Sequence, residues 1–193
     1  VLALVIDIVL LPTLHELARR GGGYRGVLYA GVMLHPDGTP NVIEFNCRLG
    51  DPETQAVIPL VHAGLLPLLD AAARGESLPN IAGRDGAAVT TILAAAGYPD
   101  APVKGAVITL PGDLPGDVTI YHAGTSRLPD DTLVVSGGRV LAVTAVAATF
   151  AAAQAASRST ALRVTFDGKQ MRSDIGWREA ARLAPHRRQG RST

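Results

Sequence analysis

Cysteine is almost absent from this sequence of 193 residues, in which Cys47 is the only one. A single thiol excludes an internal disulfide and any metal site built from several cysteines. Such cysteine usage is typical of a reducing compartment, so the sequence predicts a cytoplasmic location.

Excess charge of either sign is also missing. Lysine and arginine together number 18, aspartate and glutamate 17, which gives a formal net charge of +1. A chain so evenly charged has no overall field that would attract nucleic acid or an anionic membrane. We therefore expect neither as a partner, and a function with small molecules fits the composition better.

A long hydrophobic run is missing as well. The most apolar segment, residues 1–11, contains Asp7 and ends before Pro12. It is far shorter than the roughly 20 residues that a membrane-spanning helix needs. It also lacks the basic start and the cleavage site of a signal peptide. Because the sequence opens on Val1 and not on methionine, we expect that an N-terminal part of the same protein precedes it.

Hydrophobic residues make up 47% of the chain, which is enough for one core or two small ones. The pattern of residues changes near residue 75, and it predicts an α+β protein with two parts and a tail. Residues 1–75 form the first part, residues 76–180 a β-rich second part, and residues 181–193 a flexible basic tail. The tail carries several arginines but no aromatic residue, which favours a solvated segment over a nucleic-acid-binding arm.

Local patterns predict the elements of each part. In the first part we expect a helix over residues 1–17, a hairpin of strands 27–34 and 41–45 around the turn 35–40, and short helical pieces over 53–70. In the second part we expect strands at 87–95, 106–110, 118–122, 133–135 and 139–143, a helix over 145–156 and a strand over 162–166.

Three polar residues stand two apart in the second strand of the hairpin, namely Glu44, Asn46 and Arg48. Side chains of a strand alternate between its faces, so these three share one face. A carboxylate and an amide oxygen are hard ligands suited to Mg²⁺, and an arginine beside them suits phosphate oxygens. For the bare E-x-N-x-R pattern alone, a half-solvated strand without a function is the favoured interpretation. Cys47 falls on the opposite face, where we predict that it packs in the core.

The residues after this strand make the pattern specific, because a glycine turn brings Asp51 and Glu53 directly after the polar face. The segments 24–33 (YRGVLYAGVM) and 42–55 (VIEFNCRLGDPETQ) closely resemble the last catalytic segment of the glycinamide ribonucleotide synthetases, which are ATP-grasp ligases. Further segments occur in the order that this family shows: Gly97-Tyr98-Pro99, Lys104-Gly105, His122-Ala123-Gly124-Thr125, Gly137-Gly138-Arg139 and Arg172-Ser173-Asp174-Ile175-Gly176.

This resemblance implies the C-terminal part of an ATP-grasp domain, followed by a small β-rich domain similar to a barrel-sandwich hybrid. It implies a ligase that uses ATP to join glycine to 5-phosphoribosylamine in purine biosynthesis. By the same likeness Glu44 and Asn46 match ligands of Mg²⁺ or Mn²⁺, and Arg48 is placed to steady an acyl phosphate. Asp51 and Glu53 match loop carboxylates that either bind substrate or fix the loop. The family's nucleotide-binding lobe and a further metal-binding glutamate belong to the expected upstream part.

Two alternatives stay open. Another ATP-grasp ligase or a carboxylase component would share the E-x-N-x-R pattern, although not the G-D-P-E-T-Q continuation. A non-catalytic remnant of such an enzyme would also fit a chain without the nucleotide-binding lobe.

The remaining polar candidates in the second part favour structural roles. His122 has no second ligand or nucleophile near it in the sequence. The glycines before Arg139 fit a turn between strands better than a phosphate cradle. Arg172 and Asp174 are spaced for a surface ion pair.

Overall fold

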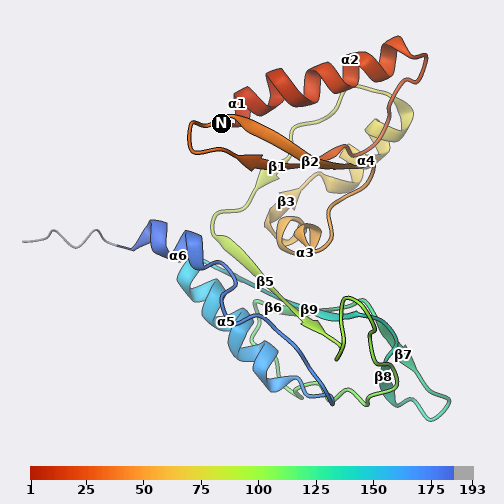
Figure 1. Ribbon diagram of the computed structural model, residues 1–193, viewed down its shortest axis with the longest axis vertical. Coiled ribbons are helices and arrows are strands. Elements are labelled where there is room, and N and C mark those ends of the chain that lie inside the picture. The colour runs from red at the N-terminus through yellow and green to blue at the C-terminus, as the bar shows by residue number, and fades with distance from the viewer. Residues whose placement is uncertain (185–193) are drawn as a thin grey trace, which may run out of the picture. The chain divides into compact units, whose positions relative to one another are not determined.

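A computed structural model describes residues 1–184, apart from the side chains of residues 62 and 63. The chain forms two compact units (Figure 1). The first contains residues 1–54 and 61–83, and the second contains residues 55–60 and the chain from residue 84 onward. Helices and sheets occur in both units, which confirms the predicted α+β class. The division at residue 75 stays a prediction.

The first unit begins with three consecutive helical segments: α1 (Leu2–Val5), the π-helical segment η1 (Ile6–Leu10) and α2 (Leu11–Arg19). Pro12 lies in the first turn of α2, directly after the π-helical segment, and it has no N–H to donate to the preceding helical turn. This segment exposes much apolar surface, since Val1, Leu2 and Ile8 are each more than half exposed. None of the helices in residues 1–184 is long and apolar enough to cross a membrane.

The predicted hairpin is present as strands β1 (Tyr29–Leu34) and β2 (Pro40–Asn46), paired antiparallel. Turn chemistry closes it, because His35 N–H donates to the Thr39 carbonyl at 2.9 Å and Thr39 N–H donates to the Asp37 carboxylate at 2.8 Å. Hydrogen bonding from Thr39 lowers the pKa of Asp37. The hairpin places residues 40–46 in one extended strand, as the alternating pattern requires.

Short elements complete the first unit and lead into the second: α3 (Glu53–Val57), the 3₁₀ turn η2 (Ile58–Leu60), β3 (Val61–Ala63), α4 (Leu65–Arg74) and β4 (Ala82–Gly83). The helices are short, as expected for a segment with Pro59 and Pro67. The pairing of β3 with β4 was not predicted, because a strand of three residues has too little pattern to be recognised.

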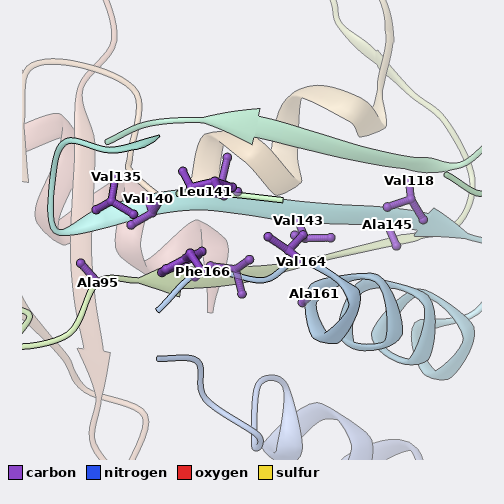
Figure 2. Packing of buried hydrophobic residues seen from close by; sticks show 12 residues of the cluster. Ala95, Val118, Val135, Val140, Leu141, Val143, Ala145, Ala161, Val164 and Phe166 are labelled. Carbon is purple, nitrogen blue, oxygen red and sulfur yellow. The ribbon is translucent and has the colours of Figure 1, made fainter. Parts of the chain in front are cut away.

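The second unit is built on a three-stranded antiparallel sheet in the order β5–β9–β6. Its strands are β5 (Ala87–Ala94), β6 (Val118–His122) and β9 (Arg139–Ala147), and a separate pair joins β7 (Thr125–Arg127) to β8 (Leu133–Val135). The long helix α5 (Phe150–Arg163) packs against the sheet (Figure 2). Because β9 is the central strand, Val140, Leu141 and Val143 are buried at 0–1% exposure.

Several boundaries in this unit differ from the predictions. Residues 106–110 form isolated bridges to Val134 and Thr165 instead of a strand. Residues 145–147 continue β9, and α5 begins only after Thr149, whose hydroxyl accepts from Ala152 N–H as the N-cap. The predicted strand over 162–166 is also wrong, since α5 runs to Arg163. The helix α6 (Trp177–Leu183) was not predicted and includes the first residues of the expected tail, whereas residues 185–193 lie outside the described part.

Candidate active site in the first unit

Glu44 and Asn46 lie side by side on one face of β2, as the sequence predicts. The Asn46 side-chain amide donates to a carboxylate oxygen of Glu44 at 2.9 Å. Glu44 is exposed and Asn46 is half-buried. The second carboxylate oxygen of Glu44 and the amide oxygen of Asn46 take no part in this bond. The pair therefore presents hard oxygen ligands from two adjacent side chains.

A glycine opposite Glu44 leaves room for its side chain. Gly31 pairs with Glu44 in the hairpin, and the register shifts between Gly31 and Val32. A Cβ atom at Gly31 would lie 3.1 Å from Cγ of Glu44. This contact is tight enough to push the Glu44 side chain aside, so the glycine keeps the carboxylate in its position beside Asn46.

Arg48 lies past the end of β2, because the strand stops at Asn46. Its side chain is exposed, and one guanidinium nitrogen donates to the Leu49 carbonyl at 2.9 Å. Glu44 and Asn46 therefore lie in the strand as predicted. The prediction that Arg48 lies in the same strand is wrong. Its position is set by the loop. The guanidinium has five N–H donors, so this single bond leaves others for an anion.

The loop after β2 turns tightly around Gly50. The Gly50 carbonyl accepts from Thr54 N–H at 3.0 Å and also from the Thr54 hydroxyl. The peptide bond between Asp51 and Pro52 is cis. Glu53 then begins α3. This turn brings the carboxylate of Glu53 back toward the hairpin, where it lies against Gly50.

Tyr29 is the residue of this site that the sequence did not single out. It pairs with Asn46 in the hairpin and is half-buried. Burial, the charge of Glu53, hydrogen bonding with Glu53 and the charge of Glu44, in that order, raise the pKa of Tyr29. The phenol therefore lies near both carboxylates and links the loop to the polar face of β2. Its place opposite Asn46 was the available signal, because cross-strand partners share a face.

A side chain at position 50 is expected to disturb this arrangement. A Cβ atom there would lie 2.5 Å from a carboxylate oxygen of Glu53 and 3.1 Å from the Tyr29 ring. Gly50→Ala should therefore displace Glu53 and lower the free energy of local opening by about 1–3 kcal/mol, the usual cost of overpacking. Hydrogen exchange of the paired amides of β1 and β2 measures this change. Gly23→Ala is the matched control, since nothing lies within 4 Å of its Cβ position, and equal protection in both variants would contradict the expectation.

Cys47 is exposed, so the prediction that it packs in the core is wrong. The thiol lies near the Tyr24 hydroxyl. Burial and the hydrogen bond to Cys47 raise the pKa of Tyr24, whose hydroxyl also donates to the Val27 carbonyl at 2.7 Å. Cys47 thereby contacts the segment that leads into β1.

The polar candidates of the second unit make local contacts. His122 Nδ1 lies 3.0 Å from the Thr125 hydroxyl, and Arg139 donates to the Tyr98 hydroxyl at 3.1 Å. A Cβ atom at Gly138 would lie 2.4 Å from the Tyr98 ring, so this glycine allows close packing. Arg172 and Asp174 form an exposed ion pair at 2.6 Å, as expected. These contacts agree with structural roles.

The described residues of the first unit do not form a complete metal site by themselves. Within residues 1–184, no group of three or more histidine, cysteine, aspartate or glutamate side chains is arranged to hold a metal ion. The oxygens of Glu44 and Asn46 nevertheless fit a hard cation such as Mg²⁺, which binds few protein ligands and keeps several waters. The pair is suited to one side of a metal site that other groups complete.

Comparison with known protein families identifies the family of this chain. Residues 1–54 match the model described as phosphoribosylglycinamide synthetase, ATP-grasp (A) domain. Residues 88–178 match the model described as phosphoribosylglycinamide synthetase, C domain. The chain belongs to the phosphoribosylglycinamide synthetase family. The ATP-grasp match contains Glu44, Asn46, Arg48 and the loop to Thr54.

Individual members of the family agree over most of the chain. The phosphoribosylamine–glycine ligase of Caulobacter vibrioides is 44% identical over 174 residues, which are 88% of this chain and 40% of the relative. The enzyme of the same name from Mycobacterium tuberculosis is 43% identical over 178 residues, 91% of this chain and 41% of the relative. The chain therefore spans about 40% of the length of these ligases.

Solved structures support the same assignment. The crystal structure of phosphoribosylamine–glycine ligase from Thermotoga maritima matches with a TM-score of 0.75 and 42% identity, over 84% of this chain and 40% of that chain. The biotin carboxylase domain of the Hydrogenobacter thermophilus 2-oxoglutarate carboxylase matches with a TM-score of 0.58 and 18% identity, over 77% of this chain and 33% of that chain. The second likeness shows a shared fold.

Proposed function

We propose that this chain is the C-terminal part of an ATP-dependent ligase that joins glycine to 5-phosphoribosylamine and forms glycinamide ribonucleotide for purine biosynthesis. The observation that carries this proposal is the adjacent Glu44 and Asn46 pair on β2, within the residues matched by the ATP-grasp domain model. The names of the similar ligases, at 43–44% identity, supply the substrates.

Glu44 and Asn46 would hold Mg²⁺ or Mn²⁺ through their oxygens. When bound, such an ion neutralises charge on the phosphates of ATP during phosphoryl transfer. The crystallised Hydrogenobacter domain contains the magnesium salt of ADP, and its fold resembles that of this chain. Gly31 supports this role by leaving the Glu44 side chain in place.

The reaction has two steps in this proposal. A carboxylate oxygen of glycine attacks the γ-phosphorus of ATP, so that ADP leaves and glycyl phosphate forms. The amine of phosphoribosylamine then attacks the acyl carbon, phosphate leaves, and the amine loses a proton to give the amide. Arg48 would stabilise the charge on the acyl phosphate through its remaining N–H donors.

The loop residues Asp51 and Glu53 would contribute to substrate binding. Both are exposed, and the Glu53 carboxylate and the Tyr29 ring both lie against Gly50. A carboxylate near the polar face of β2 suits recognition of the amine groups of glycine or phosphoribosylamine. Tyr29 would act here as a positioning residue.

The proposal requires a partner, namely the N-terminal part of the same enzyme. It would supply the nucleotide-binding lobe and a further metal-binding carboxylate. The single, exposed thiol of Cys47 supports a cytoplasmic location, and the even charge supports small-molecule partners over nucleic acid or membrane.

Substrate dependence tests the reaction class. The complete protein, with its upstream part, is assayed for ADP formation with ATP and Mg²⁺. We expect turnover only when glycine and freshly generated phosphoribosylamine are both present, and no turnover when bicarbonate and biotin replace them. ADP formation that depends on bicarbonate and biotin would instead support the alternative of a carboxylase component.

A further inference from the structure

A cavity of about 370 Å³ lies in the second unit beside α5. Figure 1 shows α5 with the chain that leads to α6 running alongside it. Val89 and Thr91 of β5 line it on one side, α5 on a second, and Arg172, Ser173 and Ile175 on a third. This space, the α5 cavity, is separate from the polar face of β2 in the sequence and belongs to the other unit.

The walls of the α5 cavity are tied together. The Gln154 side-chain amide donates to the Ile175 carbonyl at 2.6 Å, which fixes residues 172–175 beside α5. The polar group among the β5 residues of the cavity already has a hydrogen-bond partner, because the Thr91 hydroxyl bonds to the Ser157 hydroxyl at 2.7 Å. Val89, the other residue there, is apolar and buried. The β5 side therefore offers mainly apolar contact to anything that enters.

The charge of the cavity lining is positive. Arg158 and Arg172 line it, and no aspartate or glutamate does. Arg172 is paired with Asp174, but residues 1–184 provide no ion-pair partner for Arg158. Arg163, on the same helix, is paired with Asp113. Of the two arginines that line the cavity, Arg158 is therefore the one without an ion-pair partner among residues 1–184.

We propose that the α5 cavity binds a small organic phosphate monoester. The guanidinium groups of Arg158 and Arg172 match phosphate oxygens, and the hydroxyl of Ser173, which also lines the cavity, adds a donor. Val89 and Leu162 provide apolar contact for the organic group. A volume of about 370 Å³ falls in the range of small-ligand sites. This proposal does not depend on the ligase activity.

Titration of the ¹⁵N-labelled chain with phenyl phosphate, inorganic phosphate and phenol tests the proposal. We expect saturable shifts of the amides of Arg158 and Ser173 with phenyl phosphate, at a Kd at least about tenfold lower than for inorganic phosphate. Arg158→Gln should raise the Kd at least about tenfold, the usual effect of losing a charge-assisted contact. The matched control Arg163→Gln should leave it within about twofold.

Three results would overturn the proposal. One is the absence of saturable shifts with phenyl phosphate at millimolar concentrations. The second is an equal loss of affinity in Arg158→Gln and Arg163→Gln, which would indicate general attraction to the charge of α5. The third is a Kd for phenol or for inorganic phosphate as low as that for phenyl phosphate. Such a result would show that the cavity does not need both a phosphate and an organic group in its ligand.

Discussion

Glu44→Gln is expected to reduce kcat of the complete ligase at least about 100-fold at saturating Mg²⁺. The substitution keeps the size of the side chain and its place beside Asn46, but it removes the negative charge that would hold the metal ion. Losing one preorganised electrostatic contact of a transition state typically costs about 100-fold or more in rate. Steady-state kinetics with varied Mg²⁺ measure the effect.

The matched control is Glu179→Gln, which makes the same chemical change in α6. Glu179 is exposed and paired with Arg182 at 2.6 Å, a surface pair of the kind that contributes little. The kcat of the Glu179→Gln variant should stay within about twofold of the kcat of the unchanged enzyme. A Glu44→Gln variant only a fewfold slower than the control would remove the role of Glu44 as a metal ligand.

The second large effect concerns the chain by itself, which we expect to fold but not to form glycinamide ribonucleotide. Phosphoryl transfer depends on holding the nucleotide in position and on stabilising charge. Glu44 and Asn46 are the two metal ligands that we propose in the first unit, and two ligands bind Mg²⁺ weakly because the ion gives up its waters reluctantly. The upstream part must supply the other groups.

Exposed apolar surface in the first unit agrees with this expectation. Ile43 on β2 is 66% exposed and Leu2 on α1 is 74% exposed. Such side chains are usually covered in a complete protein, and we expect the proposed upstream part to cover them here. The second unit has its own core around β9, with Leu93, Val140 and Val143 fully buried. This core explains why the chain should fold without the upstream part.

The polar pair of the site could be predicted because it depends on a local rule. Side chains two apart in a strand share a face, and the turn at residues 35–40 fixes where the strand begins. The hydrogen bond between Asn46 and Glu44 confirms this rule. This rule fails for Arg48 because β2 ends two residues earlier, at Asn46. The alternation of side chains in the sequence does not mark where the strand ends.

The contact between Tyr29 and Glu53 could not be predicted in the same way. It joins segments well apart in the sequence and depends on how the chain turns at Gly50, so it reflects the path of the loop and not a periodic pattern. The short strands β3, β4 and β7 are similar cases, since their pairing is set by tertiary neighbours. The extension of β9 to Ala147 likewise reflects pairing with β5, which outweighed the helix propensity of the alanines.

The most direct test of the account is a ligase assay of the 193 residues with and without the upstream part. The purified chain is incubated with ATP, Mg²⁺, glycine and freshly generated phosphoribosylamine, and phosphate release is measured. We predict no release above background for the chain alone and turnover once the upstream part is added. Sustained turnover by the chain alone would contradict the account, because it would show that the nucleotide site lies within these residues.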